Sequence, residues 1–166
     1  MDFSKIVREH QSLVFSLAYH MLRNAASAEE VAQEVFLRLY QDRARISTDE
    51  HLVHWLRRTA THRCLDILRR PANRPHLDVT ELELSSEPKA VDPFMDRTLR
   101  RLVSALSPTA RAMIVLRYQE DLEPREIAAM LDLPLATVKS RLQRALVVLR
   151  GKLAREEGPS YGAARA

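Results

Sequence analysis

The 166-residue sequence contains one cysteine, three glycines and no long uninterrupted apolar segment. The single thiol, Cys64, excludes an internal disulfide framework and any metal site built from several cysteines. No apolar stretch approaches the roughly 20 residues that a membrane-spanning helix needs. Residues 1–20 mix charged and apolar side chains, so we expect no secretory signal. These absences predict a soluble protein of the reduced cytoplasm.

Charge is abundant and unevenly distributed. The chain contains 26 Lys and Arg residues against 22 Asp and Glu residues, a net charge of +4. Residues 71–96 carry 2 basic and 6 acidic residues, whereas residues 97–153 carry 11 basic and 5 acidic ones. A basic carboxyl-terminal block favours a polyanionic partner. The acidic segment before it indicates two binding modules joined by a tether.

The scarcity of glycine and the abundance of Leu, Ala, Arg and Glu favour helices, so we expect an all-α protein. Apolar residues recur at helical spacing over residues 3–22. Ser27 and Glu30 have the spacing of a capping box that begins a second helix. A third helix, capped at Thr48-Asp49, is expected over residues 51–70. Together these helices form a first domain, residues 1–70.

Proline and polar residues divide the rest of the chain. Residues 71–96 contain four prolines and predict a flexible linker, with a short strand as the alternative. Residues 97–153 form a second helical domain, in which Ser107 and Pro108 begin a helix that buries Tyr118. The small residues of 154–166 predict a disordered tail.

The most specific pattern lies between Asp121 and Leu149. Two short helical patterns meet there at Asp132-Leu133-Pro134, a sequence typical of a tight turn. Ala128 is small at the point where the two helices must approach closely. This is the pattern of a helix-turn-helix, whose second helix enters the major groove of DNA. The face expected to meet DNA offers hydrogen-bonding and cationic side chains, namely Thr137, Lys139, Ser140, Arg141, Gln143 and Arg144.

Three motifs, in this order, give the chain a family resemblance. They are SAEEVAQEVFLRLY, beginning at residue 27, WLRRTATHRCLDILRR, beginning at residue 55, and PREIAAMLDLPLATVKSRLQRAL, beginning at residue 124. The chain resembles the extracytoplasmic-function (group IV, sigma-70 family) sigma factors of bacterial RNA polymerase. The resemblance covers roughly residues 5–153. It implies two small helical domains, of the region 2 and region 4 types, joined by a flexible linker.

The resemblance implies three sets of binding residues and no catalytic residue, metal or cofactor. The set expected to dock on the clamp coiled coil of the large polymerase subunit is Glu30, Gln33, Glu34 and Phe36, with Phe36 anchoring the core. The set expected to bind the minus-ten element is Ile46, Ser47, Thr48, Trp55, Arg58, His62 and Arg69. The set expected to bind the minus-thirty-five element is Arg117, Thr137, Lys139, Ser140, Arg141, Gln143 and Arg144.

The chain departs from the family pattern at a few positions. His62 stands where Asn is usual, so the family pattern does not indicate how it would read its base. Asp132 occupies a turn position where Gly is common, and Glu123 replaces a customary Ser cap. The resemblance also implies binding to the polymerase flap, a linker in the RNA-exit path, and an anti-sigma factor that holds both modules until a signal arrives.

Two other classes of function compete with this interpretation. A free-standing DNA-binding regulator explains the helix-turn-helix but gives the polar face around Gln33 no partner. A helical metal-dependent hydrolase could use some of the six histidines. However, the sequence has no H-E-x-x-H motif and no Cys/His ligand set. Two interpretations of Trp55 remain: its ring packs in the core, or it stacks on a base.

Overall fold

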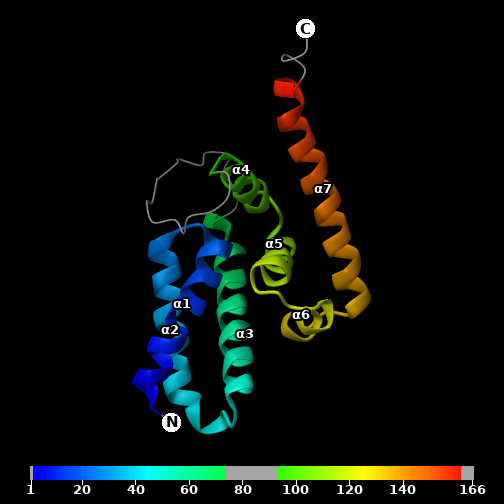
Figure 1. Ribbon diagram of the computed structural model, residues 1–166. Helices are drawn as coiled ribbons and strands as arrows, with labels where there is room; N and C mark the ends of the chain where they lie inside the picture. Colours follow the sequence, from blue (N-terminus) through cyan, green and yellow to red (C-terminus); the bar gives the residue numbers. More distant parts are fainter. Residues whose placement is uncertain (1, 74–92, 162–166) are drawn as a thin grey trace.

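The computed structural model describes residues 2–73 and 93–161. All regular secondary structure in these ranges is helical, which confirms the all-α prediction (Figure 1). The α-helices are α1 (Phe3–Leu22), α2 (Ala25–Asp42), α3 (Asp49–Leu68), α4 (Pro93–Ser104), α5 (Pro108–Ile114), α6 (Pro124–Leu131) and α7 (Leu135–Tyr161). Short 3-10 turns cover Arg43–Arg45 and Pro71–Asn73, and a π-turn covers Val115–Gln119. Within the described ranges, no helix has both the length and the apolar character needed to cross a membrane.

Helices α1, α2 and α3 form one bundle, which we call the first module (Figure 1). Its core contains side chains that solvent does not reach, among them Val14, Leu17, Val31, Leu56 and Cys64. Thr48 begins α3 as expected, because its Oγ1 accepts a hydrogen bond from the backbone N–H of His51 at 3.1 Å. The bundle presents one face of α2 and one face of α3 away from this core.

The start of α2 differs from the prediction. The helix begins at Ala25, and the N-cap residue is Asn24, whose Oδ1 accepts a hydrogen bond from the backbone N–H of Ser27 at 2.9 Å. Ser27 therefore lies inside the first turn and does not cap the helix. The physical reason is the chain reversal just before it: Arg23 has a left-handed backbone with φ of 55°, which ends α1 and leaves Asn24 extended.

Helices α4 to α7 form the second module, and α6 and α7 make the expected helix-turn-helix. Ser107 caps α5 and Pro108 is its first residue, as predicted. Asp132 has the left-handed backbone that the turn requires, with φ of 55°. Glu126 accepts a hydrogen bond from the backbone N–H of Glu123 at 2.7 Å, which supports the start of α6.

Several predicted features of the second half are wrong. Helix α4 begins at Pro93, inside the segment expected to be linker. Tyr118 is 56% exposed because the π-turn directs it outward. Helix α7 continues to Tyr161 where a disordered tail was expected from residue 154, and an ion pair between Arg101 and Glu156 joins it to α4. The possible strand and residues 162–166 lie outside the described residues.

The two modules pack against each other through α3 and α1 on one side and α5, α6 and the π-turn on the other. Arg111, only 8% exposed, donates from Nη1 to the carbonyl of Met21 at 2.9 Å and from Nη2 to the carbonyl of Ser104. Arg57 pairs with Glu120 at 2.9 Å. These contacts place the second module over one face of α3.

Candidate polymerase and promoter interfaces

Helix α2 carries the four residues expected to bind polymerase, three of them on its outward face. Glu30 and Gln33 are exposed. Glu34 is half-buried, and its two carboxylate oxygens accept from Arg38 at 3.0 Å and from Arg63 of α3 at 2.6 Å. Phe36 is 8% exposed and belongs to the core, as expected of an anchor. Glu34 therefore holds α2 against α3, while Glu30 and Gln33 are the available groups on this surface.

Two apolar residues on the same helix escaped the sequence analysis. Leu37 is 66% exposed and Tyr40 is 51% exposed, and the guanidinium of Arg43 lies 4.2 Å from the centre of the Tyr40 ring. They follow Gln33 at i+4 and i+7, so they share its face of the helix. The sequence signal is that both side chains are apolar although helical periodicity places them on the polar, outward face of α2.

The residues expected to bind the minus-ten element begin in the turn before α3 and continue along that helix. Ile46 is 8% exposed and packs into the core, so it fixes the loop and is not free to meet a base. Ser47 and Thr48 are exposed, and Thr48 is engaged as the cap of α3. Trp55, in the second turn of the helix, is half-buried and packs against the core, which favours a place in the core over stacking on a base.

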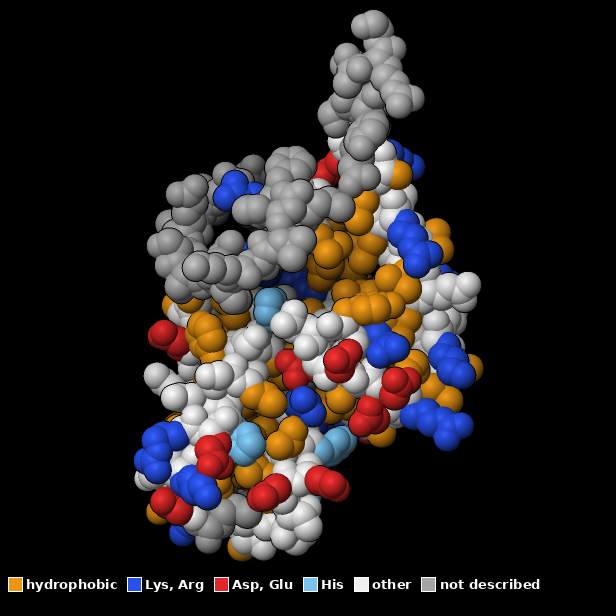
Figure 2. Space-filling model, in the orientation of Figure 1, with side chains coloured by type: hydrophobic (Ala, Val, Ile, Leu, Met, Phe, Trp, Pro, Cys, Tyr) orange, Lys and Arg blue, Asp and Glu red, His pale blue; other side chains and the backbone are white. Residues whose placement is uncertain are grey.

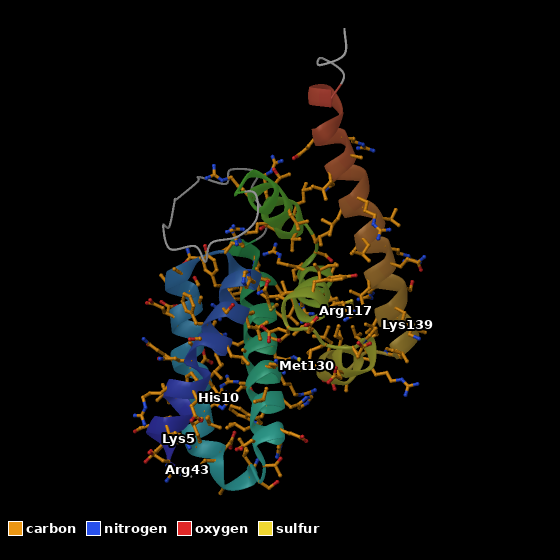
Figure 3. The ribbon with its side chains drawn as sticks, in the orientation of Figure 1. Lys5, His10, Arg43, Arg117, Met130 and Lys139 are labelled. Atoms are coloured by element: carbon orange, nitrogen blue, oxygen red, sulfur yellow. The ribbon has the colours of Figure 1, made fainter. Side chains whose placement is uncertain are left out.

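Further along α3, three of the expected minus-ten residues are engaged by the second module. Arg58 donates to the carbonyls of Ala129 and Met130 at 2.9 and 3.1 Å, and to the carboxylate of Asp132 at 2.8 Å. His62 donates from Nε2 to the carbonyl of Met130 at 2.8 Å. Arg69 donates to the hydroxyl of Thr109 at 3.2 Å. Figure 3 shows Met130 on the side of α6 that faces α3.

A cavity of about 170 Å³ lies between the modules beside these contacts. Cationic or titratable side chains come from both sides of it, and no carboxylate lines it. The lining residues are His62, Leu65, Arg69, Thr109, Leu131, Leu133 and Arg141. The sequence placed His62 and Arg69 on one promoter element and Arg141 on the other, and the fold brings them to one cavity.

The first turns of α7 present most of the expected minus-thirty-five residues to solvent. Lys139, Arg141, Gln143 and Arg144 are exposed, whereas Thr137 and Ser140 are half-buried. Val138 between them is fully buried and locks the helix against its neighbours. Lys139 lies on the outer side of α7, away from α3 (Figure 3). Figure 2 shows Lys and Arg side chains along this outer edge of the molecule.

Arg117 lies apart from this row, on the π-turn between α5 and α6. Its guanidinium is 3.4 Å from the carbonyl of Leu122, 3.9 Å from the carboxylate of Glu123 and 5.7 Å from the centre of the Tyr118 ring. The side chain is half-buried. It is therefore positioned by contacts within its own module.

Burial shifts the titration of three groups outside these faces. Desolvation raises the pKa of Cys64 to about 12, which makes it an inert thiol. Desolvation, with Arg23 and Arg100 nearby, lowers the pKa of His20. Burial and Arg23 lower the pKa of Arg111. Among the described side chains, no group of three or more His, Cys, Asp or Glu residues could hold a metal ion.

Comparisons with known proteins agree with this geometry. A family described as sigma-70 region 2 matches residues 6–74, and one described as sigma-70, region 4 matches residues 96–149. The ECF RNA polymerase sigma factor SigW of Bacillus subtilis is 31% identical over 91% of this chain and 88% of its own length. SigE of Mycolicibacterium smegmatis, also an ECF RNA polymerase sigma factor, is 31% identical over 93% of this chain and 62% of its own length.

The fold also has a counterpart among solved structures. The sigma factor RpoE of Bartonella quintana, crystallised with the anti-sigma factor NepR, aligns with a TM-score of 0.71. The alignment covers 92% of this chain and 96% of that one, at 18% sequence identity. At this level of identity the likeness concerns the fold alone.

Proposed function

The chain belongs to the extracytoplasmic-function sigma factors of the sigma-70 family, and we propose that it directs core bacterial RNA polymerase to the promoters of one regulon. It acts in transcription initiation by recognition and performs no catalysis of its own. Because its proposed partner works in the bacterial cytoplasm, we place it there. Residues 1–70 are the polymerase and minus-ten domain, residues 97–153 the minus-thirty-five domain, and residues 71–96 the connection between them.

The observation that carries this proposal is the row of solvent-facing donors on α7. Lys139, Gln143 and Arg144 project from the second helix of a helix-turn-helix, and Val138 fixes that helix from behind. Gln can donate to and accept from a base edge, whereas Lys and Arg bind phosphate or guanine. We assign Thr137, Ser140, Arg141 and Arg117 to the margins of the same minus-thirty-five interface.

The α2 face supplies the second half of the function. Glu30 and Gln33 are free to bind a polar helical partner, which we propose is the clamp coiled coil of the large polymerase subunit. Glu34 supports this face through Arg38 and Arg63, and Phe36 anchors it in the core. A free-standing regulator would have no use for this surface.

The minus-ten strand is assigned to the loop before α3 and to one face of α3 itself. Ser47 and Thr48 are exposed at the loop, where Ile46 holds its backbone in place. Arg58, His62 and Arg69 supply the donors further along the helix, with Trp55 as packing support at its start. We further propose that the second module contacts the polymerase flap and that an anti-sigma factor regulates the protein.

Run-off transcription with purified core polymerase on a genomic fragment library tests the function. We expect a defined set of promoters to be transcribed only when the protein is present. Gln33→Ala should weaken association with core, and Gln143→Ala should change promoter choice without affecting core association. Glu9→Gln, on the exposed surface of α1, is the matched control. Tight specific binding to duplex DNA without polymerase, and none to core, would support a free-standing regulator instead.

A further inference from the structure

Two neighbouring hollows share part of their walls. The first is the cavity of about 170 Å³ beside His62, and the second is a groove of about 440 Å³ along one side of α7. Thr109 of α5 and Arg141 of α7 line both hollows, so the cavity and the groove adjoin at these two side chains. A single molecule could therefore extend from one hollow into the other.

The walls around the shared side chains are cationic. The guanidiniums of Arg69 and Arg141 line the cavity, and those of Arg141 and Arg144 line the groove. No Asp or Glu side chain is among the residues that line either hollow. Asp132, close by in sequence, pairs with Arg58 at 2.8 Å. A hollow lined by charge of one sign attracts an ion of the opposite sign, so an anionic ligand is favoured.

Most of the donors on these walls are not used by the protein. Arg141 and Arg144 make no hydrogen bond or ion pair with any residue that the structure describes. Arg69 donates to the hydroxyl oxygen of Thr109 at 3.2 Å, and the hydroxyl proton of Thr109 can still serve a further acceptor. A guanidinium carries five N–H donors in one plane, and pairs of them bind phosphate oxygens. The donors of the cavity thus fit a phosphoryl group.

The groove differs from the cavity because its floor is apolar. Leu106, Ala110, Ala145 and Val148 form this floor, and Val148 is 44% exposed. Figure 2 shows hydrophobic side chains gathered between α5 and α7. The volume of the groove falls in the range of about 300–1,000 Å³ that is usual for small-molecule sites. A planar heterocycle could lie on this floor with the guanidinium of Arg144 against its face.

We propose that the two hollows form one binding site for a nucleoside diphosphate, with the phosphates in the cavity and the base in the groove. Thr109 and Arg141 stand where the two parts of this ligand join. The site goes beyond the proposed function, which involves no small molecule. Arg141 and Arg144 also belong to the proposed minus-thirty-five set, so a bound nucleotide would occupy donors that the promoter needs; only this overlap rests on the proposed function.

Simpler ligands would use half of the site. Inorganic pyrophosphate could occupy the cavity but would leave the apolar floor of the groove empty. An uncharged nucleoside could occupy the groove but would leave the guanidiniums of Arg69 and Arg141 without a counter-charge. Comparison of the three molecules therefore separates one continuous site from two unrelated hollows.

Titration calorimetry on the free full-length chain makes this comparison with ADP, inorganic pyrophosphate and adenosine. We expect ADP to bind at one site per chain. Its affinity should exceed that of pyrophosphate and that of adenosine by roughly tenfold or more, because its two linked parts bind together. Thr109→Val removes the hydroxyl where the hollows meet, and it should weaken ADP and pyrophosphate alike by about threefold to tenfold.

Val148→Glu and Val147→Glu form a matched pair of variants. Val148 lines the groove, whereas Val147, its neighbour in sequence, is 62% exposed and does not. Both variants add the same charge to the same helix, so a loss of non-specific attraction would be equal in the two. We expect Val148→Glu to weaken ADP by roughly tenfold and Val147→Glu by less than about twofold, since only the first puts a carboxylate beside the ligand.

Three results would overturn the proposal. ADP that does not bind, or binds no more tightly than pyrophosphate, would show that the groove contributes nothing. Equal weakening by Val148→Glu and Val147→Glu would show that ADP follows the net charge of the surface. The titrations contain neither polymerase nor DNA, so failure of the proposed function looks different: the chain would bind ADP as expected but would associate with neither core nor promoter.

Discussion

The cap of α2 offers a sharp test of how this fold is specified, because two residues compete for the role. In the structure Asn24 Oδ1 accepts from the backbone N–H of Ser27, whereas the sequence pattern alone assigned the cap to Ser27. Asn24→Ala should therefore remove one hydrogen bond from the first turn of α2. Ser27→Ala should remove none and should place the best helix former inside the helix.

The expected difference follows from the value of an N-cap. Loss of an Asn cap costs about 1 kcal/mol of unfolding free energy, within a range of roughly 0.5–2 kcal/mol. In a chain of 166 residues that corresponds to a fall in Tm of about 2–4 °C. Ser27→Ala should stay within about 0.5 kcal/mol of the parent protein. Ser12→Ala, at an exposed position in the middle of α1, controls for helix propensity.

Urea unfolding followed by circular dichroism at 222 nm measures these free energies, and a thermal melt gives Tm. The two variants should separate clearly, with Asn24→Ala the less stable. The reasoning is refuted if Ser27→Ala costs more than Asn24→Ala, since a capping box centred on Ser27 and Glu30 would then be the true start of the helix.

Three further predictions concern buried groups. Burial, Arg23 and Arg100 lower the pKa of His20 below 6.5, so the unfolded chain binds this proton more readily than the folded chain does. The free energy of unfolding should therefore fall as the pH drops from about 7 through 6.5, and it should fall less in His20→Gln. Urea midpoints that change equally with pH in the two proteins would contradict this. With its pKa raised to about 12, Cys64 should react with a disulfide reagent at pH 8 only in urea, and rapid reaction of the folded chain would show the thiol to be accessible. Arg111→Met leaves the carbonyls of Met21 and Ser104 without their donor and should lower the free energy of unfolding in urea by about 2–4 kcal/mol. An unchanged urea midpoint would contradict this and would mean that removal of the buried charge offsets the lost hydrogen bonds.

Local features of the fold were predictable from the sequence where a residue acts on its own neighbours. Thr48 and Ser107 cap the helices that they were expected to cap, and Asp132 takes the left-handed turn. Tyr118 was assigned to the interior because a regular helix would bury it. The π-turn breaks that period, and a hydrophobic pattern contains no sign of the change.

In the candidate site, too, local features were predictable from the sequence and long-range contacts were not. The exposure of Lys139 and Gln143 on α7 follows from helical periodicity. The engagement of Arg58 by α6 does not, because the two lie more than 70 residues apart in sequence and no local pattern brings them together. Likewise, α7 continues past residue 153, where Glu156 pairs with Arg101 of α4, a partner that composition could not identify.

The π-turn of Val115–Gln119 sets the direction of the chain that follows it. Such a turn amounts to one extra residue in a helical segment, and here the backbone N–H of Glu120 donates to the carbonyl of Val115 at 3.1 Å across the widened loop. Deleting a single residue would restore a regular helix and rotate the following residue by about 100°. Glu120 would then swing away from Arg57. The mutual orientation of the two modules thus depends on chain register at one turn, and length changes there should matter more than changes of side chain.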